Sequence, residues 1–198
     1  MNYLAHAFLS FNHHEILLGN MISDFVKGKK KFDYPTLIQK GIMLHRAIDN
    51  FTDTHEATKK AKIFFKQDYG LYAGAFIDIV YDYFLANDST QFPDNALANF
   101  SNETYQQLKL QEGFFPEKFQ KFFYYMQLQN WLYNYQFKEG ITKSFRGLVH
   151  RSEYMHDADA AIIIFEKNIY ELKKYYDDFF PLLKQFSFRK MNELLSET

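Results

Sequence analysis

Cysteine is absent from this sequence of 198 residues. Without thiols the chain has no disulfide framework, no thiolate nucleophile and no cysteine-ligated zinc or iron–sulfur site. Any metal ion that the protein binds would therefore be held by histidine and carboxylate ligands.

The sequence also lacks an excess of charge and a long apolar run. Its 23 basic and 24 acidic residues give a formal net charge of -1, which argues against a general polyanion binder but permits a local basic patch. No uncharged apolar segment approaches the roughly 18 residues of a membrane span, and the first residues lack the features of a signal peptide. We expect a cytoplasmic protein that binds neither nucleic acid nor a membrane, and the oligomeric state stays open.

What the chain does contain is helical periodicity. Apolar residues recur at three- and four-residue spacing, whereas sustained two-residue alternation is scarce. With 47% hydrophobic residues, this spacing predicts an all-α fold, a compact helical bundle that forms a single domain over residues 1–198. Proline suits the first turn of a helix, so helix starts are expected at Pro35, Pro93, Pro116 and Pro181. The predicted helices span residues 14–27, 36–51, 54–67, 71–87, 94–111, 117–137, 139–151 and 157–179, with a last helix after Pro181.

Two carboxylates stand out in segment 71–87, which is apolar on nearly all sides and is therefore expected at the centre of the bundle. Asp78 and Asp82 carry its only charges, and their four-residue spacing places them on one helix face. A buried ionised carboxylate is costly unless a cation or several hydrogen bonds compensate it. A metal ion would do so; an exposed edge or a capping role is the alternative interpretation.

Similar pairs occur earlier in the chain. His45 and Asp49 lie four residues apart, beside a predicted buried stripe, and Asn20 and Asp24 have the same spacing. His6 lies among apolar neighbours; a lone histidine there is more often a satisfied core residue, and the other pairs make it a candidate ligand. Imidazole and carboxylate ligands suit Mn²⁺, Fe²⁺, Zn²⁺ or Mg²⁺.

Four segments together resemble one family, the bacterial acyl carrier protein phosphodiesterases, a branch of the HD-type metal-dependent phosphohydrolases. The segments are MNYLAH at the start, GNMISDFVKG at 19–28, GIMLHRAIDNFTD at 41–53 and DIVYDYFL at 78–85. A looser resemblance follows around Trp131, Leu132, Tyr135, Gly147 and Arg151. The resemblance implies an all-helical, HD-domain-like enzyme that hydrolyses the phosphodiester joining 4′-phosphopantetheine to a serine of holo acyl carrier protein.

The resemblance also implies roles for individual residues. The HD-type signature falls on His45 and Asp49, spaced H-x-x-x-D rather than as an adjacent pair. A divalent metal is expected, Mn²⁺ before Mg²⁺, Fe²⁺ or Zn²⁺, and it would make a water molecule nucleophilic and polarise a phosphoryl oxygen. The expected metal ligands are His6, Asp24, His45, Asp49 and Asp78. The expected catalytic residues are Asp24, Arg46 and Asp82.

Substrate binding is expected from Asn20 and from a basic run. Acyl carrier proteins are acidic, and Lys27, Lys29, Lys30 and Lys31 directly follow the segment that carries Asp24. Such a run suits docking of an acidic protein, although surface lysines are usually just solvated.

Two alternatives remain open. One is an HD-type phosphohydrolase that acts on a nucleotide or another small phosphoester. The other is a noncatalytic helical module whose polar pairs are structural and whose lysine run contacts a nucleic acid or an acidic protein.

Overall fold

The structure is a computed structural model that describes residues 1–155 and 157–197. Within these ranges the chain forms eleven α-helices and four 3-10 helices, with no strand, which confirms the predicted all-α class. In the same part of the chain, no helix combines the length and apolar character needed to cross a membrane. The α-helices are α1 (Tyr3–Phe8), α2 (His14–Ile22), α3 (Thr36–Thr54), α4 (Glu56–Tyr69), α5 (Ala73–Ala86), α6 (Ala96–Lys109), α7 (Glu117–Leu128), α8 (Trp131–Asn134), α9 (Lys138–Arg151), α10 (Asp159–Lys167) and α11 (Ile169–Ser196). The 3-10 helices are Ser23–Phe25, Gly28–Asp33, Gly70–Tyr72 and Glu112–Phe114.

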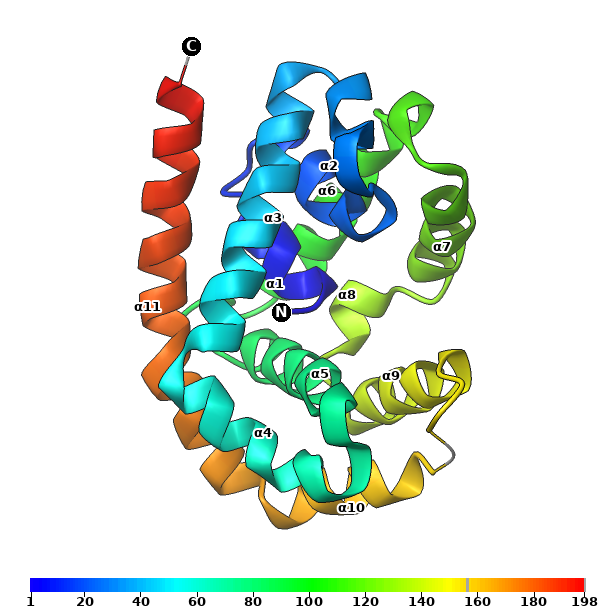
Figure 1. Cartoon of the computed structure of the whole chain (residues 1–198), viewed down its shortest axis with the longest axis vertical. Helices are drawn as coiled ribbons and strands as arrows, with labels where there is room; N and C mark the ends of the chain where they lie inside the picture. The colour runs from blue at the N-terminus through cyan, green and yellow to red at the C-terminus, as the bar shows by residue number, and fades with distance from the viewer. Residues whose placement is uncertain (156, 198) are drawn as a thin grey trace.

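Helix α5 lies at the centre of the molecule (Figure 1) and packs against α1, α4, α9 and α11. Its sequence, AGAFIDIVYDYFLA, is apolar on nearly every side, and most of its residues are buried. The central position predicted for this segment is therefore confirmed. Burial of its apolar side chains on every side stabilises the bundle through the hydrophobic effect.

Helices α2 and α3 approach each other closely at two glycines. A Cβ atom on Gly19 would lie 2.1 Å from the carbonyl oxygen of Ile38, and one on Gly41 would lie 2.4 Å from that of Ile16. Any larger side chain would force the two backbones apart. This contact sets the distance between the polar residues that follow each glycine, Asn20 on α2 and His45 on α3.

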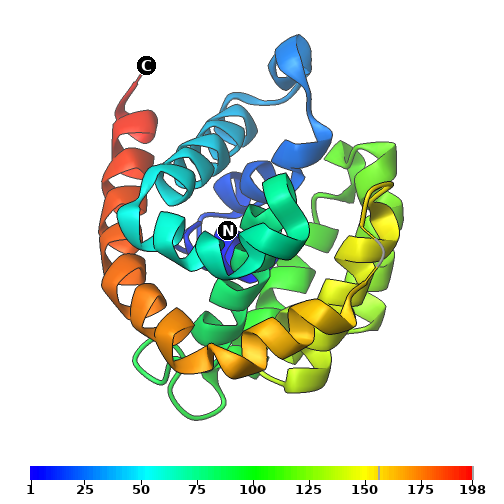
Figure 2. The same cartoon turned by 60° about the horizontal axis from the view of Figure 1, so that its bottom comes forward.

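The long helix α11 covers one side of the molecule and packs along α3, α4 and α5. The prediction that a helix starts at Pro181 is wrong, because Pro181 lies inside α11. A proline within a helix removes one backbone hydrogen bond and bends the axis, and Figures 1 and 2 show α11 curving around the bundle. Here the apolar face on both sides of the proline, including Phe179, Phe180 and Leu183, is buried, and this packing maintains one bent helix.

Three further element predictions differ from the structure. The predicted helix 157–179 is divided at Asn168 between α10 and α11. The predicted helix 117–137 is divided into α7 and α8, because Asn130 adopts a left-handed conformation with φ of 48°. Helix α2 ends at Ile22, and Asp24 lies in the following 3-10 helix instead of continuing it. Helix α1 was not predicted, since its six residues are too few to display a period.

Candidate metal centre

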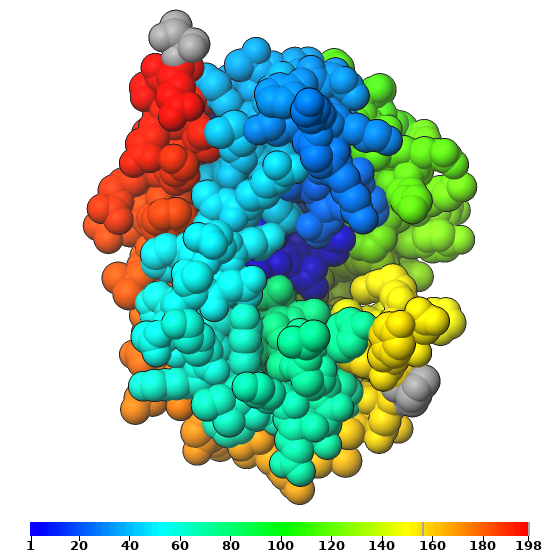
Figure 3. Space-filling view, in the orientation of Figure 1, coloured from blue at the N-terminus to red at the C-terminus, as the bar shows by residue number. Residues whose placement is uncertain are grey.

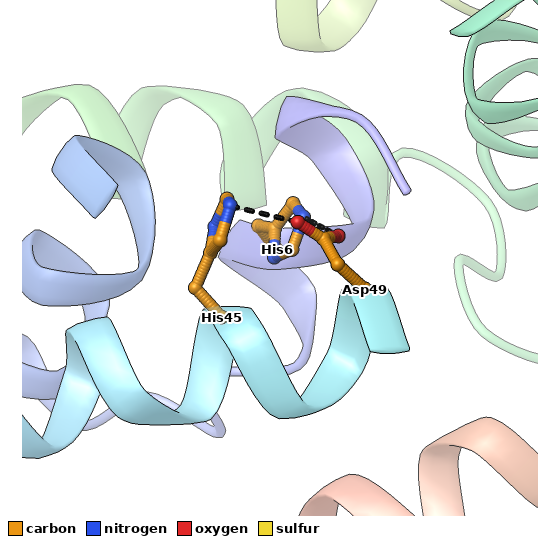
Figure 4. Close-up of side chains that lie close together, drawn as sticks. All are labelled: His6, His45 and Asp49. Carbon is orange, nitrogen blue, oxygen red and sulfur yellow. Dashed lines mark hydrogen bonds and ion pairs between the residues drawn. The ribbon is translucent and has the colours of Figure 1, made fainter. Parts of the chain in front are cut away.

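Side chains from three elements converge on one cluster: His6 on α1, His45 and Asp49 on α3, and Asp24 on the 3-10 helix after α2 (Figure 4 shows the first three). Asp49 bridges the two histidines, with Oδ1 3.1 Å from Nε2 of His6 and Oδ2 3.0 Å from Nε2 of His45. Asp24 Oδ1 lies 3.2 Å from the same Nε2 of His45. One ligand atom each from His6, His45 and Asp49 lies within 4.8 Å of the others.

Asn20, a fully buried residue, orients both imidazoles. Its side-chain Oδ1 accepts from Nδ1 of His6 at 2.8 Å, and its backbone oxygen accepts from Nδ1 of His45 at 2.7 Å. The amide orientation is fixed because its Nδ2 donates to the carbonyl oxygen of His6 and to the Ser10 hydroxyl. Both Nδ1 atoms therefore carry a proton, and both Nε2 atoms face the carboxylates.

The two imidazoles lie nearly parallel, with ring centroids 3.9 Å apart and an angle of 16° between planes. A neutral imidazole protonated on Nδ1 has only a lone pair on Nε2. At His6 this lone pair faces a carboxylate oxygen, so two acceptors lie 3.1 Å apart. A cation between them would turn this repulsion into attraction.

The spacing of the acceptors suits a divalent cation. Ligand atoms at about 2.1 Å from a metal and at right angles to each other lie about 3 Å apart, which agrees with the 3.0 to 3.2 Å separations in the cluster. Imidazole ligands that donate their other N–H to a fixed acceptor are the usual arrangement at metal sites. The residues present therefore fit a metal held by His6, His45 and Asp49, and Asp24 contacts the same cluster through Nε2 of His45.

The charges of the cluster are strongly coupled. Burial and the neighbouring His45 lower the pKa of His6. Burial would also lower the pKa of His45, but hydrogen bonds to Asp24 and Asp49 outweigh burial and raise it to about 9. The pKa of Asp24 is lowered chiefly by its hydrogen bond to His45. For Asp49, burial raises the pKa, yet the two histidines hold it far below its ordinary range. Without metal, the cluster thus keeps two carboxylates ionised around a proton on His45.

Asp78 lies beside the cluster but is paired differently. Its Oδ1 is 2.9 Å from the α-amino group of Met1, which is also 3.4 Å from Oδ1 of Asp49. Asp78 is not among the three residues whose ligand atoms come together. Its expected role as a metal ligand stays a prediction.

Asp82 is fully buried behind α1, away from solvent. Its two oxygens accept hydrogen bonds from the backbone N–H groups of Leu4 and Ala5, at 2.7 and 3.2 Å. These groups lie at the start of α1, where helix N–H donors need partners and a negative charge is favoured. Asp82 therefore positions the helix that carries His6. The capping role, the alternative interpretation of the carboxylates on α5, therefore holds for Asp82. The catalytic role expected for Asp82 stays a prediction.

The remaining expected site residues lie at the surface around the cluster. Arg46 is exposed and donates a hydrogen bond from Nη2 to the carbonyl oxygen of Val26 at 3.1 Å. Val26 follows the 3-10 helix of Asp24, so the guanidinium lies beside that segment. Lys29, Lys30 and Lys31 lie in the next 3-10 helix, and Lys27 directly precedes it. Lys31 is half-buried and the other three lysines are exposed.

The role of Asn20 as an orienting residue was missed by the sequence-based interpretation, which expected it to bind substrate. Its buried side chain is occupied by His6 and Ser10. The available signal was its position: Asn20 follows the small residue Gly19 in a segment of α2 that is otherwise apolar, where a buried amide must find hydrogen-bond partners.

Comparison with known proteins places the chain among named relatives. A family model described as acyl carrier protein phosphodiesterase matches residues 1–183. Proteins named acyl carrier protein phosphodiesterase are similar to the chain over most of their length. That of Yersinia pestis is 30% identical over 184 residues, 92% of this chain and 95% of that protein. That of Photorhabdus laumondii is 32% identical over 187 residues, which cover 94% of this chain and 91% of that protein. That of Serratia proteamaculans is 28% identical over 186 residues, which cover 93% of this chain and 96% of that protein. No solved structure matches the chain significantly.

Proposed function

Because the chain belongs to the acyl carrier protein phosphodiesterase family, we propose that it hydrolyses holo acyl carrier protein with a divalent cation at the His6, His45, Asp49 and Asp24 cluster. The bond cleaved is the phosphodiester between 4′-phosphopantetheine and a serine of the carrier protein. The products are apo acyl carrier protein and 4′-phosphopantetheine.

The observation that carries the metal dependence is the pair of Nε2 atoms aimed at carboxylate oxygens. Asn20 binds both Nδ1–H groups, so the lone pair of His6 and the oxygen of Asp49 need a cation between them. A divalent cation, when bound, supplies positive charge that polarises a phosphoryl oxygen and makes a water molecule more acidic. Mn²⁺ is the cation we propose, and Mg²⁺, Fe²⁺ and Zn²⁺ fit the same donors.

Residues of the chain would orient the metal ligands, orient the attacking water and stabilise the charge that develops during hydrolysis. Asn20 keeps both imidazoles in one tautomer, and Asp82 keeps α1, and with it His6, in place. Asp24 is exposed at one edge of the cluster and has a lowered pKa, so it is an ionised acceptor available to orient an attacking water. Arg46, after release of the Val26 carbonyl, would stabilise negative charge that develops on the phosphoryl oxygens.

The direct test is the mass of holo acyl carrier protein after incubation with the protein and Mn²⁺, with and without a chelator. We expect loss of the phosphopantetheine group only when metal is present. Hydrolysis that continues unchanged in chelator would contradict the metal dependence. An unchanged mass with metal-loaded, folded protein would contradict the substrate, and hydrolysis of small phosphoesters by the same sample would then favour the small-molecule alternative.

For docking of the acidic carrier protein we propose the lysine run Lys27, Lys29, Lys30 and Lys31. The run supports docking because it follows the 3-10 helix of Asp24 along the chain and three of its four lysines, Lys27, Lys29 and Lys30, are exposed. Charge reversal of all four is expected to raise KM for holo acyl carrier protein about tenfold, equivalent to about 1.4 kcal/mol, with kcat nearly unchanged. The matched control reverses four exposed lysines on other helices, Lys66, Lys109, Lys167 and Lys174. Equal KM values in the two variants would remove the docking role.

A further inference from the structure

A cavity of about 220 Å³ is lined in part by Tyr3 of α1, the helix that also carries His6 of the metal cluster. It is enclosed by the start of the chain, α8 and α9, with one residue of α5. Figure 3 shows the start of the chain at the floor of a hollow between α3 and α9. The cavity lining includes Asn2, Tyr3, Trp131, Asn134, Tyr135 and Arg151. Four of the five later positions that carry the looser family resemblance thus line one cavity: Trp131, Tyr135, Gly147 and Arg151.

Helix α1 connects this cavity with the cluster. Tyr3 lines the cavity, and His6, one helical turn further along α1, belongs to the cluster. The Tyr3 ring packs on Phe122 at 4.9 Å between centroids, and Phe122 packs on Trp131 at the same distance. Burial and the carboxylate of Asp24 raise the pKa of Tyr3, and the guanidinium of Arg151 partly offsets them. Tyr3 is therefore close enough to feel both Asp24 of the cluster and Arg151 of the cavity lining.

The lining combines aromatic, amide and charged groups, the last from Glu139, Lys143 and Arg151. Trp131 and Tyr135 offer aromatic surface, and Asn2 and Asn134 offer amide donors and acceptors. Asn2 stands at the N-cap of α1 without a side-chain capping bond, so its amide is available to a ligand. At about 220 Å³ the cavity is smaller than the ~300–1,000 Å³ of most small-molecule pockets, so it has room for a small ligand or for one segment of an extended chain.

We propose that this cavity is the subsite for the pantetheine arm of the substrate. The assignment rests on the proposed function, since the arm is attached to the phosphate that would react at the cluster. The arm is a flexible chain whose methyl-bearing and methylene carbons suit the aromatic walls and whose two amides suit the asparagines. Binding of this remote part of the substrate fixes the phosphodiester in the orientation required for hydrolysis.

The test fills the cavity without touching the cluster. Gly147, on the cavity-facing side of α9, has space for a larger side chain, because a Cβ there would meet only the flexible guanidinium of Arg151, at 3.3 Å. Gly147→Leu is expected to weaken binding of pantetheine, measured by calorimetry in chelator, by about tenfold, and to raise KM for holo acyl carrier protein by about tenfold. Gly74→Leu is the matched control on α5, where a Cβ would meet only the end of the Lys62 side chain. It is expected to leave both values unchanged.

The outcomes separate this assignment from the proposed function. Hydrolysis of holo acyl carrier protein by the wild type, with pantetheine binding and KM unchanged in Gly147→Leu, overturns the subsite and leaves the proposed function standing. A wild type that does not hydrolyse the carrier protein overturns the proposed function. Pantetheine binding that is lost in Gly147→Leu supports the subsite in that case too. If Gly147→Leu does not fold, Ser144→Leu on the same lining decides by the same measurements.

Discussion

The buried amide of Asn20 determines what the two histidines can do. Because its side-chain and backbone oxygens both accept from Nδ1 atoms, each imidazole presents Nε2 toward Asp49. The metal-binding capacity of the cluster thus depends on a residue that would not itself touch the metal. Outer partners of this kind fix the tautomer and ring orientation of a ligand.

Replacing Asn20 by alanine tests this dependence. We expect Asn20→Ala to weaken Mn²⁺ affinity by about 10- to 100-fold and to lower the free energy of unfolding by about 1–3 kcal/mol, because buried donors lose their acceptor. Calorimetric Mn²⁺ titration and urea unfolding measure the two effects. The control is Ser101→Ala on α6, which removes a buried hydroxyl bonded to the Leu97 carbonyl and should lower stability without changing Mn²⁺ affinity. A Mn²⁺ affinity of Asn20→Ala equal to that of the wild type would show that the orientation of the two histidines does not depend on Asn20.

Asp82 predicts a pH dependence of stability. Burial raises its pKa to about 7, although the N–H groups of Leu4 and Ala5 oppose the shift. A carboxyl whose folded pKa is raised contributes most stability below its unfolded pKa, near 3.9, and loses it as pH rises through about 7. Across that window the metal-free protein should lose about 4 kcal/mol from this group, at about 1.4 kcal/mol for each pKa unit.

Asp82→Asn isolates this contribution because an amide does not ionise. In chelator, urea unfolding from pH 4 to 8 should show a flatter pH dependence in the variant, with lower stability at pH 4 since one N–H loses its acceptor. Asp53→Asn, at an exposed carboxylate paired with Lys62, should retain the wild-type dependence. Parallel curves for Asp82→Asn and the wild type would exclude Asp82 as the titrating group.

At the scale of helices, the glycine contact between α2 and α3 brings the parts of the cluster together. Gly41→Ala would place a methyl group 2.4 Å from the Ile16 carbonyl oxygen. The helices must separate, so we expect a loss of about 1–3 kcal/mol in unfolding free energy and weaker Mn²⁺ binding as the Asn20 carbonyl leaves His45. Gly74→Ala on α5, where space is available, should instead keep the affinity and gain up to about 1 kcal/mol from helix propensity. Equal free energies of unfolding in Gly41→Ala and Gly74→Ala would show that α2 and α3 can adjust to the extra methyl group without loss of stability.

The sequence predicted helices well where the apolar period was long and poorly where a local feature interrupted it. Segments 36–51 and 71–87 correspond to α3 and α5. Pro181 was misleading, because tertiary packing keeps α11 continuous through the proline. The break at Asn130 was missed, because a left-handed residue ends α7 there without a glycine to mark it. Local spacing alone shows neither effect.

At the scale of the whole molecule, the site depends on contacts that spacing does not reveal. The pair His45 and Asp49 was predicted from its four-residue spacing, and both residues lie in the cluster. Similar spacing put Asp78 and Asp82 on one face of α5, yet they meet the Met1 amino group and the start of α1. These partners are more than 70 positions distant, and only the folded chain brings them together. The HD-type affiliation stays a prediction.

A cluster assembled from α1, α3 and the segment after α2 should link metal binding to global stability. A ligand that binds only the folded state stabilises it by about 2.7 kcal/mol at a free concentration of 100 Kd. For a chain of this size that corresponds to a rise of about 5–10 °C in Tm. Thermal unfolding with Mn²⁺ and with chelator measures the shift. Asp49→Asn, which weakens the contacts to both histidines, should lose it, whereas His14→Gln, at an exposed histidine, should retain it. Equal shifts in both variants would place the stabilising cation elsewhere, and the cluster would then be a structural network of hydrogen bonds.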